Sequence, residues 1–164
     1  MTSQASYYVQ QVDFSQSIQR QHLEQMLIAY SEDEMGGGKA LSKSLTKRSI
    51  ELLASKPYAF SFLCYQEDTP VGFANCLEAL STFSAEVVIN IHDLAVVPEH
   101  RNKGLSQRLL QSIEGFARQQ NACKITLEVL EGNKRARKIY QKFGFDGFSL
   151  DPDTGNALFW QKKL

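Results

Sequence analysis

Hydrophobic residues recur along this chain with two different spacings, and these spacings predict its helices and strands. Apolar positions three and four residues apart are typical of a helix that buries one face. They predict four helices, one from Ser15 or Ser17 to the acidic cluster at 32–34, and others at about 42–55, 104–119 and 133–143. Extended apolar or alternating segments predict seven strands, at about 7–14, 58–65, 71–80, 86–97, 124–130, 145–150 and 157–162.

The order of these elements predicts the fold class. One strand is followed by two helices, three strands, a helix, a strand, a helix and two strands. The turn at residues 67–70 joins the second and third strands into a hairpin. We therefore expect an α+β protein built around one mixed sheet, with a single domain that covers residues 1–164.

The composition is that of a globular protein. The 164 residues are 43% hydrophobic and 22% charged, which is not the composition of a disordered chain. No apolar run reaches the ~18–20 residues that cross a bilayer, and residues 1–6 lack the charged and apolar regions of a signal peptide. We therefore expect a cytoplasmic protein with no membrane partner. The three cysteines, Cys64, Cys76 and Cys123, are expected to be reduced and buried.

The charges are balanced overall but unevenly distributed. Residues 1–96 carry 6 basic and 11 acidic side chains, whereas residues 97–142 carry 10 basic and 4 acidic ones. A protein that binds nucleic acid is usually basic overall, so the balance argues against such a partner. A basic segment beside an acidic remainder suits a small anionic ligand in one place and a cationic one in another, although two solvated faces of unequal charge would give the same counts.

The segment from Val96 to Ser106 carries the most informative pattern. A strand ends at Pro98, a short basic loop follows, and a helix begins at Gly104. The unpaired amides of a helix's first turn and the positive end of its dipole favour anions, and a glycine there lets the backbone approach a ligand. On the glycine alone, an ordinary strand-to-helix turn is the better explanation.

Two familiar phosphate-binding loops do not fit the chain. A dinucleotide-binding loop of the Rossmann type needs three glycines where this loop has one. The run Gly36–Lys39 looks like the end of a Walker A loop, but Asp33 stands where the first glycine of that motif should be. The triple glycine is therefore predicted to be a flexible loop between two helices.

Two motifs, taken together, resemble those of the GNAT family of N-acetyltransferases. The first is Arg101-x-x-Gly104-x-Ser106 after a strand, which is similar to the family's loop for the pyrophosphate of acetyl-CoA. The family usually has Gly or Ala where Ser106 stands and often has a glycine where Asn102 stands. The second motif, about thirty residues later, is Asn133-x-x-Ala136-x-x-x-Tyr140-x-x-x-Gly144-Phe145. With the matching element order, the resemblance implies a GNAT-type sheet, mostly antiparallel, flanked by helices on both faces in three layers.

The resemblance also implies a reaction and a cofactor site. The reaction is acetyl transfer from acetyl-CoA to an amine of a small molecule or a peptide, by direct attack on the thioester and without a metal. The strand end at 94–96 supplies the backbone donor for the thioester oxygen. The implied cofactor-binding residues are Leu94, Ala95, Val96, Arg101, Asn102, Lys103, Gly104, Leu105, Ser106 and Asn133.

The reaction needs an acid for the leaving thiolate and a base for the amine. Tyr140 stands at the family's acid position, although a packed core tyrosine would show the same spacing. A phenol has a pKa of ~10 and the thiol that forms has a pKa near ~8.5, so this proton transfer is uphill until the site shifts one of the two pKa values. An alkylamine of pKa ~10.4 must lose a proton before it attacks. His92 is the predicted base because imidazole titrates near neutral pH, with Asp93 as its orienter or as an anchor for the amine.

Strand alternation places Asp93 on the same face as Ile91, unless a bulge shifts the phase. A surface histidine beside a capping aspartate is nearly as good an explanation of this pair. Asn133 is also suited to cap the short helix that follows it, which is compatible with contacting the cofactor.

The acceptor and the assembly are left open by the sequence. The resemblance places part of the acceptor side at the first two helices and their loop, and the acidic residues at 32–34 there favour a cationic amine. A polyamine, an amino sugar, an amino acid and a peptide terminus all fit, and a homodimer is compatible with the chain. The alternative from another class is a non-catalytic acyl-CoA-binding sensor or assembly module of the same fold, but the presence of Tyr140 favours an enzyme. An enzyme that uses a longer acyl chain is the third alternative.

Overall fold

A computed structural model describes residues 6–149, 151, 153 and 155–164 of the chain. The chain forms two compact units, the first ending at Leu130 and the second beginning at Glu131. The expectation of a single domain over residues 1–164 stays a prediction.

The first unit contains a five-stranded sheet. Its strands are β1 (Tyr7–Gln11), β2 (Ala59–Gln66), β3 (Thr69–Ser81), β4 (Glu86–Val96) and β5 (Lys124–Leu127). They lie side by side in chain order, and every neighbouring pair is antiparallel except β4 and β5, which are parallel. Its helices are α1 (Ser17–Glu32), α2 (Lys43–Ala54) and α3 (Leu105–Gln119), with 3₁₀ turns η1 (Glu34–Gly36) and η2 (Pro98–His100). The predicted α+β class with a mixed, mostly antiparallel sheet is confirmed.

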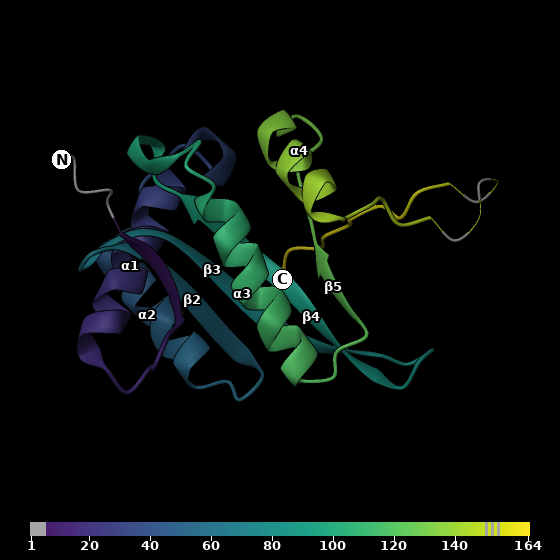
Figure 1. The fold of residues 1–164 in the computed structure, drawn as a ribbon, viewed down its shortest axis with the longest axis horizontal. Coiled ribbons are helices and arrows are strands. Elements are labelled where there is room, and N and C mark those ends of the chain that lie inside the picture. The colour runs from purple at the N-terminus through teal and green to yellow at the C-terminus, as the bar shows by residue number, and fades with distance from the viewer. Residues whose placement is uncertain (1–5, 150, 152, 154) are drawn as a thin grey trace. The chain divides into compact units, whose positions relative to one another are not determined.

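Alternation along the strands supplies a core on each face of this sheet. Leu63 and Phe73 face α1 and α2, where they form one buried cluster with Leu23 and Ile50. The neighbouring strand residues point the other way, and there the Phe116 ring of α3 lies against those of Phe60 and Phe62, with centroids 4.2 and 6.1 Å apart. Figure 1 shows α3 lying across the sheet. Helices on both faces of the sheet thus give this unit the three layers that were expected.

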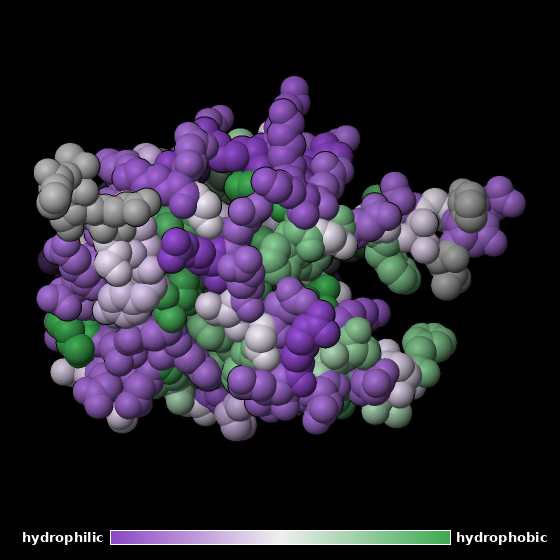
Figure 2. Space-filling model, viewed as in Figure 1, coloured by the Kyte–Doolittle hydropathy of each residue, from purple (hydrophilic) through white to green (hydrophobic). Residues whose placement is uncertain are grey.

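Surface composition follows from this burial. In Figure 2 hydrophilic residues cover most of the visible face, and hydrophobic residues lie in small separate groups. None of the helices in the described ranges is both long and apolar enough to cross a membrane. One expectation about burial is wrong: Cys64 and Cys76 are buried, but Cys123 is exposed, because it lies in the connection before the edge strand β5 rather than inside an element.

The second unit is built around α4 (Lys134–Phe143). Asn133 caps this helix as predicted, since its Oδ1 accepts the Ala136 N–H at 3.1 Å. The helix ends at Gly144, whose φ of 108° lies in the left-handed region that glycine adopts without strain.

Two strands expected near the end of the chain are not formed by the described residues there. Between 145 and 164 these residues contain one isolated bridge, between Ser149 and Asn156, and the Ala157 N–H donates to Phe148 O at 3.2 Å. The strands expected at 145–150 and 157–162 are therefore not formed by the described residues of these segments. β5 also ends three residues earlier than predicted, at Leu127. Residue 150 of the first expected strand, and residues 152 and 154 that follow it, lie outside the described residues.

Candidate functional site

One extra residue in β4 decides which helices its side chains face. Asn75 of β3 lies opposite Asp93, but the next residue, Cys76, lies opposite Ile91, so His92 forms a β-bulge. Opposite residues of neighbouring strands share a face, and successive residues of β3 alternate. Asp93 and Ile91 therefore lie on opposite faces. The expectation that they share a face is wrong, because the bulge shifts the alternation by one residue.

A line of polar side chains crosses three strands and ends at Asp93. Ser61 Oγ of β2 donates to Asn75 Oδ1 at 2.7 Å, and Asn75 Nδ2 donates to Asp93 Oδ2 at 2.9 Å. Ser61 and Asn75 are fully buried, whereas Asp93 is partly buried and His92 is exposed. The Asp93 carboxylate is thus oriented by a buried amide, which is a different partner from the predicted one, His92.

Beyond the bulge, β4 has a free edge within the first unit. β5 pairs with β4 only from Val88 to Ile91, and β5 itself ends at Leu127. Among the described residues of this unit no further strand continues the sheet on that side. The predicted cofactor-binding residues 94–96 therefore lie on the part of β4 that β5 leaves unpaired.

The direction of the backbone selects which of these residues face the free edge. The Val97 N–H donates to a carbonyl of β3 at 3.0 Å, so the Val96 carbonyl in the same peptide group points away from β3. The N–H groups of Val96 and of Leu94, two residues earlier, point the same way. Ala95 instead directs its carbonyl at β3, only 3.0 Å from where a methyl group on Gly72 would lie.

Residues 97–104, which we name the α3 loop, have left-handed backbone at two positions. The φ angles of Asn102 and Gly104 are 60° and 75°, a region that asparagine and glycine adopt most easily. Gly104 immediately precedes α3 and has no side chain with which to cap it. The N–H groups of the helix's first turn therefore lack a side-chain cap and favour an anion at this end.

The side chains around the start of α3 divide between surface and core. Lys103 is exposed and Ser106 is partly buried. Leu105 has only 2% of its surface exposed, so its backbone N–H, and not its side chain, can meet a ligand.

Strand β1 braces the α3 loop through one residue, Tyr7. Its hydroxyl lies 3.3 Å from His100 Nδ1, and its ring lies 6.0 Å from Lys103 Nζ. Arg108 Nη1 donates to the Tyr7 carbonyl at 2.9 Å. The pattern of the sequence gave no signal for this brace, because it joins residues about one hundred positions apart.

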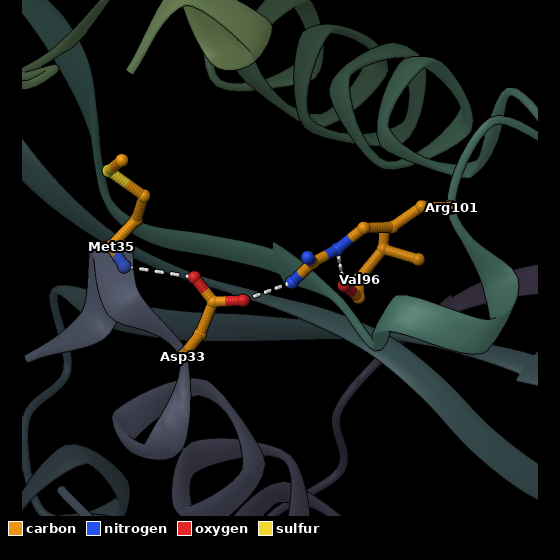
Figure 3. A network of polar contacts seen from close by, with 4 residues as sticks. All are labelled: Asp33, Met35, Val96 and Arg101. Carbon is orange, nitrogen blue, oxygen red and sulfur yellow. Dashed lines mark hydrogen bonds and ion pairs between the residues drawn. The ribbon is translucent and has the colours of Figure 1, made fainter. Parts of the chain in front are cut away.

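Arg101 has two partners inside the protein (Figure 3). Its Nε donates to the Val96 carbonyl at 2.9 Å, and its Nη2 donates to Asp33 Oδ2 at 2.5 Å. The guanidinium therefore caps the one carbonyl at the end of the free edge and pairs with the carboxylate that follows α1. A direct contact between Arg101 and a phosphate stays a prediction.

Tyr30 of α1 lies close to two of these carboxylates. Burial raises the pKa of its phenol, and the charges of Asp93 and Asp33 raise it further.

Sequence reasoning missed Tyr30, Ser61 and Asn75. Only Asn75 gave a signal, as a polar residue within the apolar run of β3.

Tyr140 and Asn133 belong to the second unit and share α4. Tyr140 is partly buried, and its ring packs edge-on to that of Phe145 with centroids 5.8 Å apart. The phenol therefore has packing contacts within its own unit, and its part as an acid stays a prediction.

Comparison with known proteins gives the same family along most of the chain. The model of the acetyltransferase (GNAT) family matches residues 23–145. An uncharacterized N-acetyltransferase, YhfO, from Bacillus subtilis is 33% identical over 85 residues, which are 52% of this chain and 54% of that protein. The streptothricin acetyltransferase of Streptomyces lavendulae is 36% identical over 63 residues, 38% of this chain and 33% of that protein. These matches thus span about half or less of the relatives' length.

Solved structures match over nearly the full length. A crystal structure of a probable acetyltransferase covers 96% of this chain and 99% of its own, with a TM-score of 0.80 and 19% identity. The aminoglycoside N-acetyltransferase AAC(6')-Iy in complex with CoA covers 100% and 99%, with a TM-score of 0.75 and 14% identity. At these identities the likeness shows the fold alone.

Proposed function

Because this chain belongs to the acetyltransferase (GNAT) family, we propose that it transfers an acetyl group from acetyl-CoA to a primary amine of a small molecule. The observation that carries the proposal is the free edge of β4 beside the uncapped N-terminus of α3. The free edge of β4 suits an extended chain that carries amide groups, and the N-terminus of α3 suits a diphosphate. CoA contains an amide-bearing chain and a diphosphate.

The proposed cofactor contacts are mostly backbone groups. The N–H groups between Asn102 and Ser106 are suited to the diphosphate, with Lys103 adding positive charge. At the free edge, the Val96 carbonyl already accepts from Arg101, so the N–H groups of Leu94 and Val96 are the donors we assign to the pantetheine arm and the thioester oxygen. The carbonyl of Ala95 is directed at β3, so we assign Ala95 no hydrogen bond to the cofactor. It lies between the two donors in the strand and spaces them. Asn133 is proposed as a further cofactor contact.

Tyr140 is the proposed acid. Its hydroxyl would give a proton to the CoA thiolate as the carbon–sulfur bond breaks, and the amine nitrogen would form the new bond to the acetyl carbon. The proton that the amine loses goes to a base on β4, so each attack releases free CoA and an N-acetylated product.

The bulge in β4 supports two proposed roles near the amine. His92 is exposed there and can take up the proton from an incoming ammonium. Asp93 is the proposed anchor for that ammonium, because its carboxylate is held by Asn75 while its partly buried position limits competition from water.

A cationic acceptor is favoured by the charges on this side of the sheet. The carboxylates of Asp93 and Asp33 both act on Tyr30. Asp33 is already paired with Arg101, so Asp93 is the carboxylate that would attract a cationic ligand near this phenol. Among the solved structures of like fold are several named as aminoglycoside acetyltransferases. We therefore propose a small polyamine or amino sugar, and a cytoplasmic location in which acetyl-CoA is at hand.

The proposal is tested by incubating the protein with acetyl-CoA and a panel of amines and measuring free thiol. Thiol release that depends on an added amine supports it. Binding of CoA without turnover over the whole panel would instead indicate a non-catalytic acyl-CoA-binding module. Turnover with propionyl-CoA or succinyl-CoA but not with acetyl-CoA would show that the transferred group is a longer acyl group, while the reaction type stays as proposed. Mass spectrometry of a metabolite extract treated with labelled acetyl-CoA then identifies the acceptor.

A further inference from the structure

Asp33 follows α1 and organises the next five residues. Its Oδ1 accepts the Met35 N–H at 2.9 Å, and its carbonyl accepts the N–H groups of Gly36 and Gly38, each at 2.9 Å. The chain turns so closely there that a methyl group on Gly36 would lie 1.9 Å from the Tyr30 carbonyl oxygen. Residues 33–38, which we name the α1 loop, therefore have a conformation that depends on Asp33.

The second carboxylate oxygen of Asp33 connects this loop to the α3 loop. It accepts from Arg101, whose side chain also holds the Val96 carbonyl (Figure 3). The Arg101 and Asp33 side chains are only 26% and 19% exposed, so salt screens this pair less than a surface pair. The planar guanidinium holds both partners in fixed directions at once.

We propose that Arg101 and Asp33 form a strut between the α1 loop and the α3 loop. Arg101 supports acetyl-CoA binding through this strut and not by contacting a phosphate, and Asp33 is a positioning residue for the cofactor site. The inference rests on the proposed function, because it concerns how the acetyl-CoA site is held in shape.

The strut has a consequence for the amine as well as for the cofactor. The side chain of Arg101, which belongs to the α3 loop, binds the end of β4 and the α1 loop at once. The resemblance assigns the α1 loop to the acceptor side and the other two segments to acetyl-CoA. A shared strut therefore links the two binding equilibria, so that each ligand favours the arrangement that the other needs.

Removing Asp33 distinguishes the strut from a direct phosphate contact by the sign of its effect. If Arg101 were a phosphate ligand, Asp33→Asn would free its guanidinium and remove a negative charge, and CoA would bind as tightly as before or more tightly. If the strut is correct, Asp33→Asn weakens CoA binding although the protein becomes less negative. Asparagine keeps an Oδ1 for the Met35 N–H, so the turn after α1 is preserved.

The test measures CoA affinity by titration calorimetry for the wild type, Asp33→Asn, Arg101→Gln and the double variant. We expect each single variant to weaken CoA binding about fivefold to tenfold, and the double variant to weaken it no further, because both act on one interaction. Glu99→Gln is the matched control: it removes one exposed carboxylate from the α3 loop and is expected to leave affinity unchanged or slightly raised. A thermal melt of every variant shows that it is folded.

A second measurement follows the α1 loop itself. We expect CoA to slow hydrogen exchange at the Gly36 and Gly38 amides in the wild type but not in Asp33→Asn, since the strut is what transmits the effect. If a variant folds poorly, the proposal can still be tested, because the effect of CoA on exchange at these two amides is measured in the wild type.

Three results would overturn the strut. They are unchanged or tighter CoA binding in Asp33→Asn, additive losses in the double variant, and no response of the α1 loop to CoA in the wild type. A wild-type protein that binds no CoA at all would instead overturn the proposed function, so the two failures are distinct.

Discussion

Asp93 owes its place in the site to a single inserted residue. Without the bulge at His92, strand alternation would turn the carboxylate toward α3, and Asn75 would have no anion to orient. A bulge depends on the register of two strands far apart in sequence, which no local pattern encodes. The identity of the residues at 92 and 93 was therefore predictable, but their directions were not. The capping role of Asn133 was predictable, because a cap is decided within four residues.

At this scale Tyr140 is the first residue to test. Tyr140→Phe removes the proposed acid and keeps the ring that packs against Phe145. We expect kcat to fall about a hundredfold, in the range of general-acid effects, with CoA affinity unchanged. Steady-state kinetics with calorimetry checks both values. Tyr58→Phe, which changes an exposed tyrosine, serves as the comparison for loss of a phenol elsewhere. A Tyr140→Phe variant with the wild-type kcat would remove Tyr140 as the acid.

The base on β4 is distinguished by pH dependence. If His92 takes the proton from the amine, His92→Gln lowers kcat/KM at neutral pH, and its profile rises only at higher pH where more amine is already neutral. The measurement is kcat/KM from about pH 6 to 10. His22→Gln, on α1 and bonded to Tyr65, controls for loss of a histidine. A profile for His92→Gln that matches the wild type would leave Asp93 as the candidate base.

Elements were predicted well where the chain itself carries the start and stop signals. The four helices agree with prediction to within about two residues, because apolar spacing, Ser42, Pro57 and Gly144 mark them locally. The two last expected strands failed for a different reason. Their composition is suitable for strands, with Phe159 and Trp160 among the residues, but a strand requires a partner along its length, and the described residues there share only one bridge.

The start of α3 offers a test at the scale of an element. Gly104 has left-handed backbone with open space around it, so a side chain there strains the loop and occupies the volume that we propose for the diphosphate. We expect Gly104→Val to abolish measurable CoA binding while the fold remains. Gly104→Asn separates the two causes, because asparagine tolerates this backbone but still fills the space. Binding by Gly104→Val with normal affinity, measured by calorimetry, would place the cofactor elsewhere.

Across the whole molecule, two buried thiols make stability depend on alkaline pH. Burial raises the pKa of Cys64 from 9.0 to about 11, and burial together with the charge of Asp93 raises that of Cys76. In the unfolded chain a thiol ionises near pH 9, whereas folded Cys64 keeps its proton to about pH 11. Between these values the folded state holds more protons, so the free energy of unfolding falls as pH rises.

Urea denaturation at pH 8 and at pH 10.5 measures this loss. We expect Cys64 to account for about 2 kcal/mol of it, since one pKa unit corresponds to about 1.4 kcal/mol. Cys64→Ala is less stable at pH 8, because it leaves a cavity, but it loses less stability on going to pH 10.5. Cys123→Ala, which changes an exposed thiol, keeps the wild-type dependence. Equal pH dependence in the wild type and Cys64→Ala would contradict the assignment.

Tyr7 adds a practical constraint on handling the protein. It is the first residue of the edge strand β1, and it touches His100, Lys103 and Arg108 with its hydroxyl, ring and carbonyl. We expect a purification tag or surface-immobilisation chemistry placed just ahead of Tyr7 to disturb these contacts and to lower the apparent affinity for CoA. Surface attachment for a biosensor is therefore better made through Cys123, an exposed thiol that follows α3 in the chain and is distant in sequence from Tyr7.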